Sequence, residues 1–393
     1  MAACVLALCL LWRQEARAQE KDYPEETSGS EEAFLQEDSD GEFSCVKEWL
    51  ASCDMGSVNE GIDSLFPGFA LDGEELLSMV MAGQAPAALG LLAGQVKSSL
   101  LGELSGIRQI LIYILVLGVV SALFAEFSDL FAGEQIAQAG FYFLYLFLMV
   151  ILTKVFLFVA EIAGGAMESI VLFIKMFIPT YFMAVGAAQG AAAAMGYYQL
   201  MLALVYLVES FLNTVLIPLI YSYVMLALLN GLWAEEKLAL LLDFIARGIG
   251  LALKAALGVV TGLGLVQAVI VPVASGLRIS AMRKAISAIP GIGGVAEGMT
   301  ELMLGSAVLI KNSLGVLLLV LLIAFCIMPL SRILIVTGVV KLGAAITGIV
   351  SDKRISACTD RVGEGCFLLL KCLAAGVAVF VIVIAVISCT FSG

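Results

Sequence analysis

The sequence predicts an all-α polytopic membrane protein, with about eight transmembrane helices that follow a signal peptide and an acidic extracytoplasmic arm. Apolar residues make up 61% of the chain and charged residues only 14%, and the mean hydropathy is +1.05. A soluble domain is about 45–50% apolar and about 25% charged. This chain therefore has too few charges to cover its apolar surface in water. The strict alternation of apolar and polar residues that is typical of a β-barrel is absent.

Charge divides the chain into an acidic arm and a nearly neutral body. Residues 1–106 carry 19 acidic and five basic side chains, whereas residues 107–393 carry 14 acidic and 16 basic ones. We expect no nucleic acid partner, because phosphates would repel the acidic arm. The chain contains no histidine, which excludes Ser-His-Asp and Cys-His catalysis and histidine-ligated metals. A nucleotide-binding P-loop is also absent, so we predict no enzyme, catalytic residue, metal site or cofactor.

The amino terminus has the pattern of a signal peptide over residues 1–18. An apolar run of about a dozen residues is followed by Ala16-Arg17-Ala18, which predicts cleavage after Ala18. The alternative is a short anchor that is not cleaved. Residues 19–106 are then the acidic extracytoplasmic arm, with short helices near the membrane surface. Its only cysteines, Cys45 and Cys53, form either a disulfide or two free thiols.

The remaining residues, 107–393, are predicted to form a multi-pass helical membrane domain. A bilayer core of about 30 Å needs about 20 apolar helical residues. Asn213 and Pro218 lie inside the fourth candidate span and predict a kink or a broken helix there. A tight turn is expected from Pro329 to Arg332, between the sixth and seventh spans. The eight candidate spans are 107–124, 138–160, 168–190, 198–230, 248–274, 306–329, 332–350 and 367–391.

The expected orientation rests on counting spans from an exported arm. With eight spans, the loops 275–305 and 351–366 both lie on the cytoplasmic side. These are the most basic internal loops, as the positive-inside rule requires. Both termini then lie outside.

Several charged residues lie in or near apolar segments, where ionisable groups are costly and often functional. Lys154, Glu161, Glu168 and Lys175 follow one another at seven-residue intervals, which suggests either an ion-pair cluster in a surface hairpin or a transport site. Glu209 lies deep in its span, one turn before Asn213. The other candidates are Lys254, Lys311 with Asn312, and Lys341. Lys311 either extends its ammonium group to the cytoplasmic surface or pairs with Glu209.

The most distinctive segment is 275–312. Arg278, Arg283 and Lys284 form a basic amphipathic start, Pro290 and neighbouring glycines form a turn, and Glu297 begins the next segment. This pattern suits an interfacial helix, a turn and a re-entry into the membrane. We expect the basic stretch to dock a cytoplasmic partner or the anionic lipid leaflet.

Several motifs of this chain occur in one order. After the basic stretch come the Ile289-Pro290 step and the E-x-x-x-x-x-x-x-G-S-x-x-L-I-K-N run from Glu297 to Asn312. P-x-x-R-I-L from Pro329, K-L-x-A-A-I from Lys341 and the tail from Asp352 to Cys358 follow. Earlier in the chain are Ile178-Pro179 with the small residues that follow, and Asn213 with Pro218. With these motifs, residues from about 105 to 393 resemble the stage III sporulation protein AE family of endospore-forming Firmicutes.

The resemblance implies a permease-like membrane subunit of the channel complex, or secretion-like apparatus, between mother cell and forespore. That complex is required for endospore formation and late forespore gene expression. The implied partners are the sister proteins of the stage III A operon, including a cytoplasmic ATPase, and indirectly the forespore-side stage II sporulation protein Q. The implied location is the mother-cell membrane surrounding the forespore. The residues alone leave an alternative open, which is a stand-alone secondary transporter that uses Glu209 and the lysines within the spans.

Overall fold

The computed structural model describes five main stretches of backbone, together with the isolated positions 90, 112, 116, 119–120, 199 and 203–204. The main stretches are 134–189, 206–232, 237–287, 293–350 and 353–389, with side chains over 139–175, 206–232, 237–263, 313–349 and 353–385. All of these belong to one compact unit, Cys53–Gly393. The predicted signal peptide, almost all of the acidic arm, Cys45 and Cys53 lie outside the described residues.

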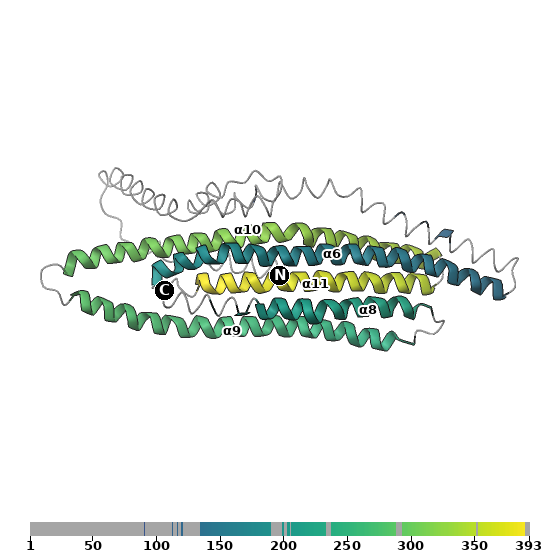
Figure 1. Ribbon diagram of the computed structural model, residues 1–393, viewed down its shortest axis with the longest axis horizontal. Coiled ribbons are helices and arrows are strands. Elements are labelled where there is room, and N and C mark those ends of the chain that lie inside the picture. The colour runs from purple at the N-terminus through teal and green to yellow at the C-terminus, as the bar shows by residue number, and fades with distance from the viewer. Residues whose placement is uncertain are drawn as a thin grey trace, which may run out of the picture. The chain divides into compact units, whose positions relative to one another are not determined.

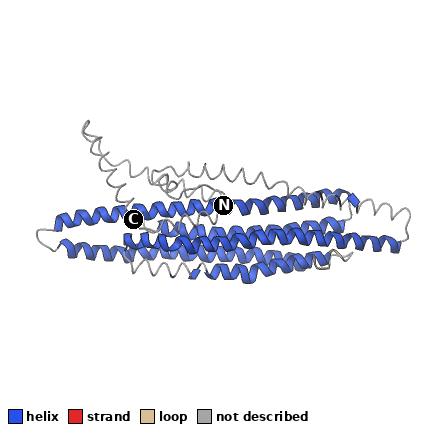
Figure 2. Ribbon diagram, turned by 45° about the horizontal axis from the view of Figure 1, so that its top comes forward, coloured by secondary structure: helices blue, strands red, loops and turns tan. Residues whose placement is uncertain are grey.

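Helices account for all the regular structure in these stretches (Figures 1 and 2). The four long helices are α6 (Glu134–Gln189), α9 (Ala239–Ser287), α10 (Gly293–Val350) and α11 (Lys353–Cys389). The shorter α8 (Ile217–Asn230) is preceded by a π-helical turn, η1 (Leu212–Leu216). The predicted all-α fold class is therefore confirmed over the described part of the chain.

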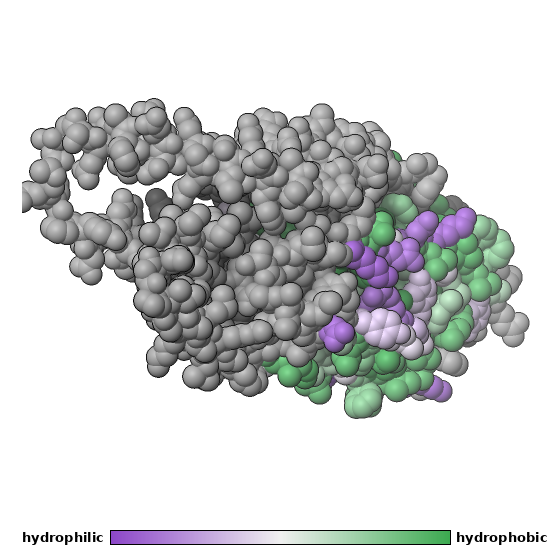
Figure 3. All heavy atoms as spheres, turned by 60° about the vertical axis from the view of Figure 1, so that its left-hand side comes forward, coloured by the Kyte–Doolittle hydropathy of each residue, from purple (hydrophilic) through white to green (hydrophobic). Residues whose placement is uncertain are grey.

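Four of the described helical segments are long and apolar enough to cross a membrane. They are Ala139–Lys175, Tyr206–Asn230, Ser313–Ile349 and Lys353–Ala385. Large apolar side chains are exposed on these segments and on α9, among them Phe143, Leu207 and Phe244. Figure 3 shows mostly hydrophobic residues on the described part of one face, with a group of hydrophilic ones among them. Exposed apolar surface of this extent is what a lipid environment requires.

Two turns predicted from the sequence are absent from the described helices, so these predictions are wrong. α6 continues through residues 161–167, and α10 continues through the Pro329–Arg332 segment. The hydroxyl of Ser331 donates a hydrogen bond to the carbonyl of Ile327, 2.6 Å away, within this helix. Proline is tolerated in such a helix because neighbouring helices and Ser/Thr hydroxyls compensate for the missing backbone bond. The count of eight spans relied on these turns, and the described residues contain four candidates.

The expected loop 351–366 is also wrong, because α11 begins at Lys353. The 58-residue α10 connects this region to the basic stretch in α9. At about 1.5 Å per residue, α10 is about 87 Å long, nearly three times the thickness of a bilayer core. The two basic segments thus lie at opposite ends of one helix, which removes the reason for placing both on the cytoplasmic side.

α11 is the central helix of the described bundle. It packs against α10, α9, α6 and α8, and Figure 1 shows it between these helices. Its buried positions are small or apolar, including three of the four buried free cysteines (Cys326, Cys358, Cys366 and Cys372). Their burial is typical of cysteines that serve as packing residues.

One buried polar contact joins three helices. The hydroxyl of Tyr145 in α6 donates a hydrogen bond to the carbonyl of Leu228 in α8, at 2.6 Å, and lies 3.1 Å from Sγ of Cys358 in α11. A Cβ at Gly231 would overlap that hydroxyl. The absence of a side chain at Gly231 therefore allows Tyr145 to reach the end of α8.

Candidate functional site

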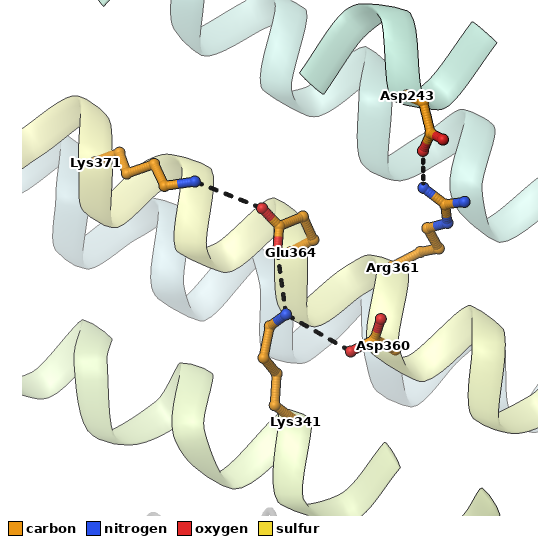
Figure 4. Close-up of polar contacts among 6 residues, drawn as sticks. All are labelled: Asp243, Lys341, Asp360, Arg361, Glu364 and Lys371. Atoms are coloured by element: carbon orange, nitrogen blue, oxygen red, sulfur yellow. Dashed lines mark hydrogen bonds and ion pairs between the residues drawn. The ribbon is translucent and has the colours of Figure 1, made fainter. Parts of the chain in front are cut away.

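Charged side chains gather where the end of α10 meets the beginning of α11 (Figure 4). Nζ of Lys341 in α10 lies 3.0 Å from Oε2 of Glu364 and 3.6 Å from Oδ1 of Asp360, both in α11. Nζ of Lys371, two turns further along α11, lies 3.5 Å from Oε1 of Glu364. Each oxygen of Glu364 therefore faces a different lysine.

A second ion pair connects α11 to α9. Arg361 forms a hydrogen-bonded ion pair with Asp243, and the hydroxyl of Tyr223 in α8 lies against the same guanidinium group. The hydrogen bond and the charge of Arg361 hold the pKa of Asp243 below its usual range. Asp243 thus stays ionised to lower pH than a free aspartate.

Together these six residues form an electroneutral ion-pair network, defined as Asp243, Lys341, Asp360, Arg361, Glu364 and Lys371. Charges of one sign in an apolar helix are costly, whereas here each acid contacts at least one base, within the Asp243–Arg361 pair or within the group of Lys341, Asp360, Glu364 and Lys371. The side chains are partly exposed, so each pair is worth about 0–1 kcal/mol. The network therefore links α11 to α10 and to α9.

Sequence reasoning found only part of this network. Lys341 was singled out as a charge within a span, and Arg361 was assigned to a basic loop. Asp243, Asp360, Glu364 and Lys371 were missed. A signal was present, because Asp360, Glu364 and Lys371 are spaced four and seven residues apart and so share a face if the segment is helical.

A polar cleft of about 360 Å³ lies between α6 and the helical residues that lead into η1. Its apolar side consists of Val171 and Ile174, which are buried. Its polar side chains carry one cation, one anion and neutral donors and acceptors: Lys175, Tyr206, Glu209, Ser210 and Asn213. Glu209 comes just before the π-helical turn and Asn213 lies within it. Such turns are frequent at functional sites.

Three of the predicted site residues are described with their side chains. Glu209 and Asn213 line the same cleft, and Pro218 is exposed in the first turn of α8, directly after the π-helical turn. The helix from Tyr206 to Asn230 is not broken, and it changes locally to a π-helix at Leu212–Leu216, between Glu209 and Pro218.

The other predicted site residues are described only in their backbone or not at all. Arg278, Arg283 and Lys284 lie within α9, and Glu297, Lys311 and Asn312 lie within α10. Pro290 and the side chains of these six residues are outside the described part, so the pairing of Lys311 with Glu209 stays a prediction.

The predicted ion-pair cluster in a surface hairpin is wrong for the charged series on α6. Lys154, Glu161, Glu168 and Lys175 lie on one continuous helix and are all exposed, so they do not form a hairpin cluster. A spacing of seven residues places them along one side of α6. Among the described residues, no group of three or more His, Cys, Asp or Glu side chains could hold a metal ion.

A comparison with protein families finds a match to Stage III sporulation protein AE over residues 71–390. The chain belongs to this family. The matched region includes all the main described helices, the ion-pair network and the polar cleft. Membership gives the chain a role in sporulation, and its apolar helices place that role at a membrane.

A curated relative supports the same assignment. The Stage III sporulation protein AE of Bacillus subtilis strain 168 is 23% identical over 251 residues, which are 63% of this chain and 62% of the relative. The alignment therefore spans somewhat less than two thirds of the relative's length. No solved structure matches this chain.

Proposed function

We propose that this chain is the permease-like membrane subunit of a trans-envelope channel complex between mother cell and forespore. Membership of the stage III sporulation protein AE family carries this proposal. Four apolar helical segments, one of which contains a π-helical turn beside a polar cleft, suit a membrane subunit that handles a polar substrate. The chain acts without catalytic residues or a cofactor of its own.

The proposed location is the mother-cell membrane that surrounds the forespore. The partners are the other products of the stage III A operon, including a cytoplasmic ATPase, and indirectly stage II sporulation protein Q on the forespore side. A signal peptide at residues 1–18 exports the acidic arm, 19–106, into the space between the two membranes. The bilayer itself is the remaining partner.

Deletion of the gene in its native host tests the sporulation role. We expect unchanged vegetative growth and a loss of heat-resistant spores, with late forespore-specific transcription absent from cells that complete engulfment. A second copy of the gene should restore both. Normal spore counts in the deletion strain would contradict the proposal.

Co-purification distinguishes a complex subunit from a stand-alone transporter. An affinity-tagged copy, solubilised from sporulating cells, should bring down the operon's other membrane proteins and its ATPase. Matched vegetative cells that express the same tagged copy are the control. Recovery of the chain alone from both cultures would favour the transporter.

A further inference from the structure

We propose that the polar cleft binds a small zwitterion, a molecule that carries an ammonium group, an anionic group and an apolar portion. Lys175 supplies a cation and Glu209 an anion to the same cleft, and Val171 and Ile174 supply an apolar wall. The chemistry of the cleft is thus complementary to such a ligand group by group. This inference concerns binding by the chain itself and does not require the channel complex.

Lys175 and Glu209 have no charged partner among the described residues. Within the described structure, neither residue forms an ion pair with the other or with any other charged group. Glu209 is partly buried in one strongly apolar helical segment, and Lys175 is the exposed last residue of another. Ionisable groups in such segments are costly unless a partner compensates them. A zwitterion supplies both partners at once and leaves the net charge of the cleft at zero.

The lysines and acids of the ion-pair network provide the contrast. There, every charge has an opposite charge within 3.6 Å, as expected for a network that holds helices together. The two charges of the cleft line one open space instead. The ion-pair network therefore suits a structural role, whereas the polar cleft suits the binding of a ligand.

Neutral polar groups and a local change in the backbone also shape the cleft. Tyr206, Ser210 and Asn213 offer two hydroxyls and an amide to the same space, which can donate to a carboxylate or phosphate and accept from an ammonium group. The π-helical turn at Leu212–Leu216 lets the helix deviate beside the cleft. Preformed concave sites with an apolar wall and a few convergent polar groups are typical of small-molecule binding.

Two sources share this ligand chemistry. One is a free α-amino acid with an apolar side chain, and the other is the ethanolamine phosphate headgroup of phosphatidylethanolamine. The experiment uses the purified full-length chain in bilayer discs, with radiolabelled L-leucine as the probe. One set of discs contains phosphatidylglycerol alone, and the other also contains phosphatidylethanolamine.

We expect saturable leucine binding in phosphatidylglycerol discs. Isoamylamine, which lacks the carboxylate, and isocaproate, which lacks the ammonium group, should compete poorly. Lys175→Met and Glu209→Gln should each weaken binding by about 10- to 100-fold, because each removes one charge-assisted hydrogen bond. Lys175→Arg keeps the charge and should retain binding. Lys254→Met removes an exposed lysine outside the cleft and is the matched control.

The lipid arm identifies the occupant. Leucine binding that is unchanged by phosphatidylethanolamine indicates a free solute, and binding that this lipid suppresses indicates its headgroup. Either result supports the zwitterion site if both variants lose binding while eluting as folded, monodisperse protein. Absence of leucine binding in both kinds of disc, or binding that is unaffected by Lys175→Met and Glu209→Gln, would overturn the proposal. Neither negative result changes the expected sporulation defect of the gene deletion.

Discussion

Glu364 is the acidic residue of the network that makes two ion pairs, since its two oxygens face Lys341 and Lys371. Glu364→Gln should therefore weaken two pairs and lower the free energy of unfolding by up to about 2 kcal/mol. Asp360 faces only Lys341, at 3.6 Å, and its side chain is 59% exposed. Asp360→Asn is thus the matched control and should cost less. Thermal unfolding of the purified variants in one detergent gives the comparison, and equal losses would show that Glu364 has no special role.

Part of the candidate site could be predicted from polar and charged residues in the sequence. Glu209 and Asn213 attracted attention because polar groups in an apolar segment are costly, and the structure brings them to one cleft. Lys175 lines the same cleft from another helix, α6. Spacing along the sequence does not reveal that Lys175 lies near Glu209. The acids that neutralise Lys341 were missed because their segment was interpreted as a loop. Identifying a charge thus required only composition, whereas identifying its partner required the helix boundaries.

The close approach of α11 to α8 depends on a glycine. A Cβ at Gly365 would overlap Cγ2 of Val224, which is buried in α8. Gly365→Ala should push the helices apart and cost about 1–3 kcal/mol, although alanine favours helices. Gly338→Ala is the matched control, because no atom lies within 4 Å of a Cβ at Gly338 in α10.

A second substitution tests whether the overlap with Val224 causes the loss of stability in Gly365→Ala. Val224→Ala removes the overlapping methyl groups, so the pair Gly365→Ala and Val224→Ala should be more stable than the sum of the two single changes implies. Unfolding in a series of denaturant concentrations measures the coupling. Additive losses would mean that the Gly365 effect does not arise from this contact.

Helix type was easier to predict than helix ends. The apolar composition and the missing strand pattern indicated an all-α membrane fold, and that held for every described element. The turns at 161–167 and Pro329–Arg332 did not form, because a turn within apolar helix leaves backbone groups without partners. Glutamates and a proline are local signals of a break, whereas the continuous hydrogen bonding of α6 and α10 depends on packing against α11 and its neighbours.

At the scale of the whole molecule, we expect the basic stretch of α9 to dock a cytoplasmic partner or the anionic lipid leaflet. Arg278, Arg283 and Lys284 lie within eight residues of one another, and each cation near an anionic leaflet is worth about 1 kcal/mol. Reversing all three charges should reduce recovery of the partner proteins and of heat-resistant spores. Replacing them with other basic residues is the control. Normal spore formation by the charge-reversed chain would show that the stretch does not dock.

Because α10 is continuous, its two ends should lie on opposite sides of the membrane. α10 contains one candidate span, Ser313–Ile349, and extends without interruption from Gly293 to Val350. A helix that crosses the bilayer once must have its two ends on opposite sides. Recognition sites for a sequence-specific protease, inserted separately at 290–291 and at 351–352, should therefore be cleaved from opposite faces of the membrane.

Right-side-out and inverted vesicles give the readout, with detergent-treated vesicles as the control that both sites are accessible. The site at 290–291 should be cleaved in one kind of vesicle and the site at 351–352 only in the other. Each inserted chain should also support sporulation, which shows that its fold is intact. Cleavage of both sites from one face would mean that α10 enters and leaves on the same side. It would restore the turn at Pro329 and the even number of crossings that the sequence alone predicted for this region.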